Sequence, residues 1–189
     1  MLSSQLPPST IAPPLEPAHD VVRVRLTDSR QVTIRPILPS DLGPLRKFFT
    51  ALSRATLRLR FHSSTNELPE HLLREFTLVH HDHAAFVAEI DNSGAGQAPT
   101  LVAEARFVRN ADSESAEFAL VVADNWRRIG LGTMLTRILA QRARFTGVRR
   151  LCGDVLEDNK AMRGLAHSLG ARLSRAIGSA QTLRLSLNV

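Results

Sequence analysis

The segment after Val122 combines residue types that could bind an anion. Gly130 and Gly132 fall where a strand and a short loop give way to a predicted helix. The first turn of a helix leaves backbone N–H groups without intrahelical partners, and the helix dipole gives them partial positive charge. Glycines let an anion approach the backbone closely, and Arg127 and Arg128 add full positive charges. This arrangement predicts a pyrophosphate site.

The spacing of these residues differs from two common phosphate-binding loops. A Walker loop needs a Lys that is absent here, and a dinucleotide fingerprint needs a third glycine where Leu135 stands. A helix start with two incidental glycines stays open as the alternative.

The elements that must position this segment follow from hydrophobic periodicity and turn signals. Apolar–polar alternation predicts strands, and apolar spacing near 3.6 residues predicts helices, the first of which we expect to be capped by Ser40. We expect an α/β domain with a mixed sheet. Its strands are predicted at residues 21–26, 31–35, 84–90, 101–108, 117–122, 150–156 and 182–187, and its helices at 40–52, 69–78, 131–145 and 159–169.

Composition limits the classes of function. The chain has 189 residues, 24 basic against 18 acidic, and a net charge of +6, so its surface attracts anions. Aromatic residues make up only 5% and the arginines are scattered, which argues against a nucleic-acid partner. The single cysteine, Cys152, excludes an intramolecular disulfide, and no apolar run is long enough to span a membrane.

The N-terminal stretch has a different composition from the rest. Half of the ten prolines lie within residues 1–20, which we expect to form a disordered tail, whereas residues 21–189 are expected to form a single domain. The tail has neither the basic residues nor the compact apolar stretch of a secretory signal, so we expect a cytoplasmic protein.

The spacing Arg-x-x-Gly-x-Gly, from Arg127 to Gly132, resembles the acyl-CoA signature of the GNAT superfamily of N-acetyltransferases. Asn159 followed by a helix and Gly170 resembles the next element of that family, and residues 32–37 resemble its opening strand. Residues 57–61 and 84–88 resemble the bacterial protein lysine acetyltransferases that modify acyl-CoA synthetases.

The resemblance implies a mostly antiparallel central sheet flanked by helices, and acetyl-CoA as the acyl donor, with no metal. The backbone of Val121 and Val122 would face the pantetheine arm. The pyrophosphate would be held by Arg127, Arg128 and the N–H groups of Ile129, Gly130, Leu131, Gly132 and Thr133. Asn159 would contact the cofactor, or would only cap its helix.

Glu117 is the candidate general base, because it lies on the strand that leads into the glycine turn and the resemblance implies a base there. The alternative is an exposed carboxylate, or one paired with an arginine. The general acid departs from the family pattern, since Ala166 stands where most members carry a Tyr and the chain contains no Tyr. His167 points about 100° away on a helix, beside Ser168.

Three other features are assigned no chemistry. The segment from His80 to His83 is a histidine-rich loop in which we do not expect a metal. Cys152 is expected to be a core residue and Trp126 a packing residue.

The leading hypothesis is direct acetyl transfer from acetyl-CoA to an amine, with a protein lysine as the acceptor. Two alternatives stay open: a small amine as acceptor, and an acyl-CoA-binding regulatory module with little turnover. The oligomeric state, monomer or homodimer, is also open.

Overall fold

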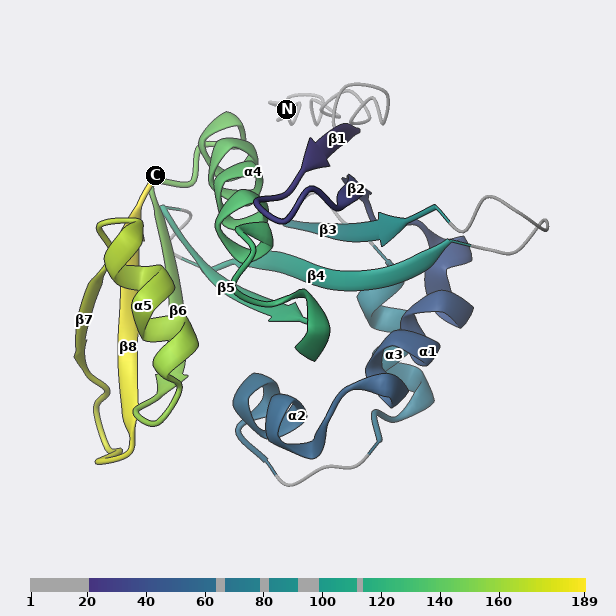
Figure 1. Cartoon of the computed structure of the whole chain (residues 1–189). Coiled ribbons are helices and arrows are strands. Elements are labelled where there is room, and N and C mark those ends of the chain that lie inside the picture. The colour runs from purple at the N-terminus through teal and green to yellow at the C-terminus, as the bar shows by residue number, and fades with distance from the viewer. Residues whose placement is uncertain (1–20, 64–66, 79–81, 92–98, 112–113) are drawn as a thin grey trace, which may run out of the picture.

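The computed structural model describes residues 21–63, 67–78, 82–91, 99–111 and 114–189, and these fold around one eight-stranded sheet (Figure 1). Its strand order is β1-β2-β3-β4-β5-β6-β8-β7, and neighbouring strands are antiparallel except β5 and β6. This confirms the predicted mixed, mostly antiparallel sheet. The strands are β1 (Val22–Arg25), β2 (Gln31–Pro36), β3 (His83–Ile90), β4 (Thr100–Arg109), β5 (Ser115–Val122), β6 (Arg150–Leu156), β7 (Arg172–Arg175) and β8 (Thr182–Asn188).

Helices cover both faces of this sheet. Within the described ranges they are α1 (Leu42–Ala51), α2 (Arg54–Phe61), α3 (Glu70–Thr77), α4 (Leu131–Phe145) and α5 (Lys160–Ser168), with short 3-10 helices η2 (Pro39–Asp41) and η3 (Asp124–Trp126). None of them is long and apolar enough to cross a membrane.

The core has two parts because strand side chains alternate between the faces of the sheet. Phe86 and Phe107 point to one face, where they join the cluster around Leu135 and Leu139 of α4. The neighbouring positions point to the other face and pack under α1, α2 and α3; this second cluster includes Leu45, Phe48, Leu57, Leu73, Val87 and Val121. The second face therefore carries a separate three-helix cover beside β5.

Two elements were not predicted from periodicity. Helix α2 is short, and Leu57, Leu59 and Phe61 alternate along it as they would along a strand. It forms because the Ser53 side chain accepts a hydrogen bond from the Thr56 N–H. Strand β7 has only four residues, and its side chains are partly or fully exposed, so no apolar pattern marks it.

The predicted N-cap at Ser40 is wrong. Ser40 lies inside η2, and Asp41 is the residue that precedes α1. Asp41 is buried and uses its carboxylate to accept bonds from Arg35 (2.7 and 2.8 Å) and from the Leu38 N–H (2.8 Å). The chain therefore enters α1 through a turn that is tied to β2, and not through a serine cap.

The pairing of β5 with β6 is short, and this feature creates the site. The two strands pair only over Ser115–Arg150, Ala116–Leu151 and Glu117–Cys152, after which β6 continues beside β8. Among the described residues, positions 118–122 of β5 thus have no strand partner on the β6 side. The strands diverge there and leave room for other groups.

Candidate functional site

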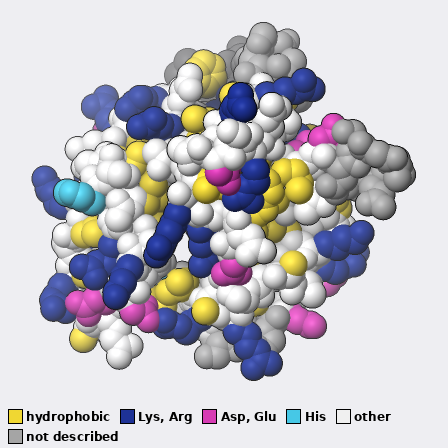
Figure 2. Space-filling view, viewed as in Figure 1, with side chains coloured by type: hydrophobic (Ala, Val, Ile, Leu, Met, Phe, Trp, Pro, Cys, Tyr) yellow, Lys and Arg dark blue, Asp and Glu magenta, His cyan; other side chains and the backbone are white. Residues whose placement is uncertain are grey.

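A cleft of about 750 Å³ lies beside the diverging end of β5. Its walls come from α2, the end of β5, the turn before α4, the first turn of α4, and α5. Figure 2 shows the face drawn in Figure 1, with Lys and Arg side chains spread widely over it. The structure brings eight predicted site residues together on the cleft lining: Val121, Val122, Arg127, Arg128, Gly130, Gly132, Thr133 and Asn159.

Gly130 and Gly132 form the start of α4 as the sequence predicts. Gly130 has a φ of 89°, a left-handed conformation that favours glycine, and its carbonyl accepts the first helical hydrogen bond, from the Met134 N–H (3.0 Å). A Cβ at Gly132 would lie 3.5 Å from Leu120 and 3.8 Å from Leu165, which would narrow the cleft between β5 and α5. The N-terminal N–H groups of α4 therefore remain accessible to an anion from the cleft.

The turn before α4 is held in place by the β1–β2 hairpin. Arg30 donates to the carbonyl of Asn125 (3.0 Å), and its guanidinium carbon lies 4.0 Å from the centroid of the Trp126 ring. The Thr27 N–H reaches the Ile129 carbonyl at 3.4 Å. Trp126 itself packs against the larger core cluster. These contacts fix the turn before any ligand binds.

Arg127 lines the cleft, but its guanidinium bonds to other groups of the protein. It donates to the Val122 carbonyl (3.2 Å) and to Thr56 Oγ1 (2.5 Å), and lies 3.3 Å from Asp124 Oδ1. Arg127 thus links α2 to the end of β5. Arg128 is exposed, with a φ of 60°, and within the described part of the chain its guanidinium has no hydrogen bond or ion pair. Of the two arginines, Arg128 is the one available to a phosphate.

Asp124 completes this link between α2 and β5. It accepts from Thr56 Oγ1 (2.7 Å), Ser53 Oγ (3.1 Å) and the Ser53 N–H (3.2 Å). Burial opposes ionisation of Asp124, but these hydrogen bonds and the charge of Arg127 outweigh it and lower the pKa of the carboxyl. The carboxylate form therefore stabilises the α2 side of the cleft.

Asn159 lines the cleft and caps α5. Its Oδ1 accepts from the Met162 N–H at 3.0 Å, which is the capping alternative considered from the sequence. A cofactor contact by Asn159 would use its side-chain NH2 group or the second lone pair of Oδ1. Ile129 and Leu131 do not appear among the described lining residues; Leu131 is buried in the core.

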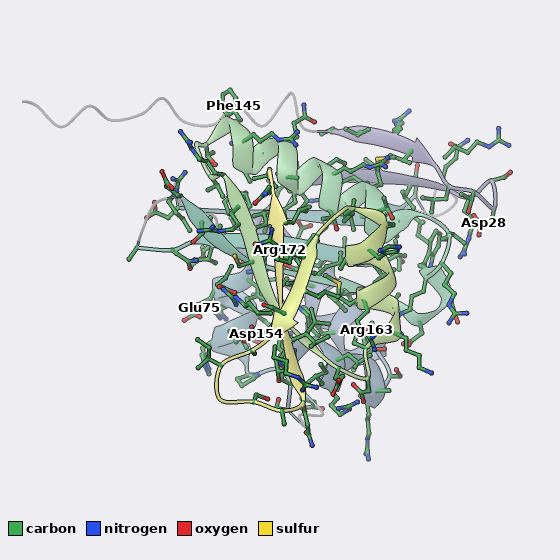
Figure 3. All side chains as sticks on the ribbon, turned by 90° about the vertical axis from the view of Figure 1, so that its left-hand side faces the viewer. Asp28, Glu75, Phe145, Asp154, Arg163 and Arg172 are labelled. Carbon is green, nitrogen blue, oxygen red and sulfur yellow. The ribbon has the colours of Figure 1, made fainter. Side chains whose placement is uncertain are left out.

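Glu117 lies at the last paired position of β5, opposite Cys152, and is not among the described residues that line the cleft. Arg184 of β8 binds both of its carboxylate oxygens, with Nη1 2.9 Å from Oε2, and also contacts Asp154 at 3.1 Å. These bonds outweigh partial burial and raise the pKa of Arg184. Figure 3 labels Asp154, the member of this group of charges that β6 carries. The arginine partner considered for Glu117 is thus present.

The positions considered for a general acid differ in their surroundings. Ala166 is buried and His167 is exposed. Ser168 lines the cleft and donates to the Leu165 carbonyl (2.8 Å). Tyr, His and Cys are absent from the described residues of the lining. Cys152 is buried in β6, and its register partner on β5 is Glu117.

In the described ranges no group of three His, Cys, Asp or Glu side chains is placed to hold a metal. His80 and His81 lie outside the described residues, as do residues 1–20 of the predicted tail.

Sequence reasoning missed four residues that shape the site: Thr56, Arg60, Gly153 and Arg184. Thr56 and Arg60 line the cleft from α2, an element that periodicity did not reveal. Arg184 is 67 positions from Glu117, and no local pattern signals such a pair. Gly153 lies where β6 closely approaches Phe118 of β5, and it had a usable signal, because an isolated glycine inside a strand often marks close approach of another backbone.

The model of the acetyltransferase (GNAT) family matches residues 49–171. Among curated proteins, acetyltransferase Pat of Mycolicibacterium smegmatis is 34% identical over 142 residues, which is 73% of this chain and 40% of that protein. Acetyltransferase PA5475 of Pseudomonas aeruginosa is 32% identical over 146 residues, 77% of each chain.

Among solved structures, the GNAT domain of PAT from S. lividans superposes with a TM-score of 0.82 at 25% identity, covering 92% of this chain and 99% of that one. The chain thus spans less than half the length of the M. smegmatis protein but nearly the whole of the S. lividans domain. The family model, the fold and the glycine turn agree, and the chain belongs to the GNAT family of acetyltransferases.

Proposed function

We propose that this acetyltransferase transfers an acetyl group from acetyl-CoA to a lysine side chain of a protein. The observation that carries the proposal is the cleft at the β5–β6 divergence, with the start of α4 on one wall and Glu117 at the point where the strands part. Residues 21–189 would act as one transferase domain. Relatives named Pat support a protein substrate, and acyl-CoA synthetases are the partners to try first.

The chain would hold acetyl-CoA through groups already in place. The N–H groups of residues 129–133 and the Arg128 guanidinium would bind the pyrophosphate, because an anion near a helix N-terminus is stabilised by the helix dipole. The edge of β5 at Val121 and Val122 that has no strand partner on the β6 side would bond to the amide groups of the pantetheine arm, with the Val122 carbonyl shared with Arg127. Bound acetyl-CoA supplies a thioester whose carbonyl carbon is open to attack.

The reaction needs a neutral amine. The amine nitrogen forms a bond to the thioester carbon, and the C–S bond breaks. The proton that the amine gives up is finally transferred to the sulfur, so that CoA leaves as a thiol. Glu117 would accept this proton from the amine first, directly or through water, since its side chain is 45% exposed and so open to solvent. Arg184 would hold the carboxylate in position beside the diverging strands. Much of the rate would come from holding both substrates together.

The first test is calorimetric titration of the protein with acetyl-CoA and with free CoA. One-to-one binding in the micromolar range supports the site and leads to an acetylation assay on acyl-CoA synthetases, read by mass spectrometry of their lysines. Absence of binding at millimolar acetyl-CoA overturns the proposal. Binding of acetyl-CoA with transfer only to small amines would overturn the proposal of a protein acceptor but would support the proposed transfer chemistry.

An acyl-CoA-binding regulatory module is the second candidate. The observation that favours it is the pairing of Glu117 with Arg184 together with a buried Ala166 at the position where the family resemblance implies a Tyr. A thiol of pKa about 8.5 is a tolerable leaving group without an acid, so transfer does not require a Tyr at this position. Tight binding of acetyl-CoA with no transfer to any amine would favour the module.

A further inference from the structure

A buried group of three charged side chains lies on the sheet face that α1, α2 and α3 cover. Glu104 of β4 is fully buried, and the Arg106 Nε donates to its Oε1 at 2.5 Å. Arg60 of α2 approaches the other carboxylate oxygen, with 3.7 Å between Nη2 and Oε2, and its side chain is 11% exposed. We call these residues the Arg60–Glu104–Arg106 cluster.

Hydrogen bonding in the cluster is incomplete on the side of Arg60. Arg106 also donates to the Phe76 carbonyl at 3.0 Å and lies 3.8 Å from the centroid of the Phe76 ring. In contrast, Arg60 Nε and Glu104 Oε2 are buried and have no hydrogen-bond partner among the described residues. The 3.7 Å separation between Arg60 Nη2 and Glu104 Oε2 is too long for a hydrogen bond, so the two atoms do not satisfy each other.

The charges of the cluster do not balance. Two arginines face one glutamate, which leaves one buried positive charge in excess. Burial is the main influence on Arg60 and lowers its pKa; Glu104 acts against this shift and Arg106 adds to it. An arginine stays protonated in proteins, so the excess charge persists and a buried anion would relieve its cost.

The cluster reaches the cleft through Arg60, which lines it from the α2 side. Glu104 is the register partner of Val121, and cross-strand partners place their side chains on the same face of the sheet. Val121 also lines the cleft, on the strand along which the thioester would lie under the proposed function. The Arg60 side chain therefore belongs to the α2 wall of the cleft in which acyl group and acceptor would meet.

We propose that Arg60 binds a carboxylate carried by one of the two substrates, and that the enzyme thereby selects substrates with an acidic group near the reacting centre. This inference rests on the proposed function. A guanidinium can donate two parallel hydrogen bonds to a carboxylate. A carboxylate also carries a single negative charge, which would neutralise the single excess positive charge of the cluster. A phosphate carries more charge than the cluster can neutralise.

The carboxylate has two sources: the acyl group, as in succinyl-CoA, or an acidic side chain next to the acceptor lysine. The transfer itself is the same in both cases, with an N–C bond formed, the C–S bond broken and the proton delivered to CoA thiol. Two matched pairs separate the sources. Succinyl-CoA is compared with butyryl-CoA, which has a methyl group in place of the carboxylate. A Lys-Glu peptide is compared with a Lys-Gln peptide, both with acetyl-CoA.

The expected result is a preference of about ten- to hundredfold in kcat/KM for the carboxylate in one pair, the usual worth of a charge-assisted hydrogen bond. Arg60→Met should remove this preference, whereas Arg54→Met should keep it, because Arg54 is an exposed arginine on the same helix. Glu104→Gln should increase the preference, because it removes the competing negative charge. A cluster that only stabilises the fold would lower the melting temperature in Arg60→Met without a change in preference.

Equal kcat/KM within both pairs for the natural sequence overturns the inference, whether or not the variants fold. The failure is distinct from failure of the proposed function, in which acetyl-CoA neither binds nor reacts. If turnover is absent, calorimetric titration measures the same preference as a ratio of dissociation constants. The two pairs compared are succinyl-CoA with butyryl-CoA and the acetylated Lys-Glu peptide with the acetylated Lys-Gln peptide. Equal constants in both titrations likewise overturn it.

Discussion

Gly153 of β6 lies directly against Phe118 of β5: a Cβ at position 153 would be 2.8 Å from the Phe118 carbonyl oxygen and 3.4 Å from its ring. This contact occurs one residue past the last paired position, Glu117–Cys152. The absence of a side chain at Gly153 thus sets the point at which the two strands part. The cleft begins where this close approach ends.

Gly153→Ala should destabilise the fold by about 1 to 3 kcal/mol, because the new methyl group can be accommodated only if the backbones of β5 and β6 move apart. The measurement is the free energy of unfolding in urea. Gly43→Ala is the matched control: Gly43 lies on α1 with open space around it, and alanine there should stabilise the helix by up to about 1 kcal/mol. Equal stability of the two variants would contradict the close approach.

Gly130→Ala should cost about 1 to 2 kcal/mol, since φ is 89° at this position and an L-residue is strained there. It should also weaken acetyl-CoA binding, because the strained turn no longer presents the first N–H groups of α4. Gly147→Ala provides the comparison. Gly147 has a φ of 83° just after α4, so its loss should lower stability to a similar degree and leave acetyl-CoA affinity unchanged. Equal loss of acetyl-CoA affinity in both variants would show that the turn at Gly130 has no specific role in binding.

Glu117→Gln should lower kcat by about 10² to 10⁴ and leave the dissociation constant of acetyl-CoA unchanged, because an amide cannot accept the proton of the amine. Asp154→Asn is the control, since Asp154 shares Arg184 with Glu117 but has no role in the proposed proton transfer. Single-turnover acetylation and calorimetry give the two quantities. Turnover near that of the natural sequence in Glu117→Gln, over about pH 6 to 9, would remove Glu117 from the mechanism.

The Asp124 link should depend on pH in a defined direction. Its pKa is lower in the folded protein than the ordinary value of 3.8, so its contribution to stability is present above that value and is lost as pH falls through the folded pKa. Asp124→Asn should therefore destabilise by about 0.5 to 1.5 kcal/mol at neutral pH, because the carboxylate is 39% exposed and solvent screens its interactions, and by less in acid.

The check is urea unfolding of both proteins at about pH 7 and about pH 3, below the usual range for Asp. Asp91→Asn, at an exposed position just after β3, should show no such pH-dependent difference. A cost at Asp124 that stays constant with pH would mean that the hydrogen bonds do not depend on the ionised form.

Local signals were enough to predict the glycine turn, α4 and most strands. Gly130, Gly132 and the amphipathic pattern of α4 lie within one continuous stretch, so their structure follows from helix-start chemistry and periodicity. The same reasoning failed at Ser40, because the buried Asp41 carboxylate binds Arg35 and reshapes the entry to α1.

The rest of the site depends on residues far apart in the chain. Glu117 meets Arg184 across β6, which lies between β5 and β8 in the sheet. Arg60 meets Glu104 only because α2 packs on the face of the sheet to which Glu104 points. No periodicity encodes such pairs. The role of Arg127 was also beyond local reasoning, since its bonds to Thr56 and Asp124 need the tertiary placement of α2.

Trp126 is the one tryptophan of the chain, and the chain has no tyrosine. Its ring lies beneath Arg30, 4.0 Å from the guanidinium carbon, in the turn that leads to Gly130. Indole emission from the unlabelled protein therefore originates at a single point beside the turn that precedes α4. Ligand titrations and stopped-flow mixing can follow that turn optically, with Arg30→Met as the variant that changes the signal without altering the fluorophore.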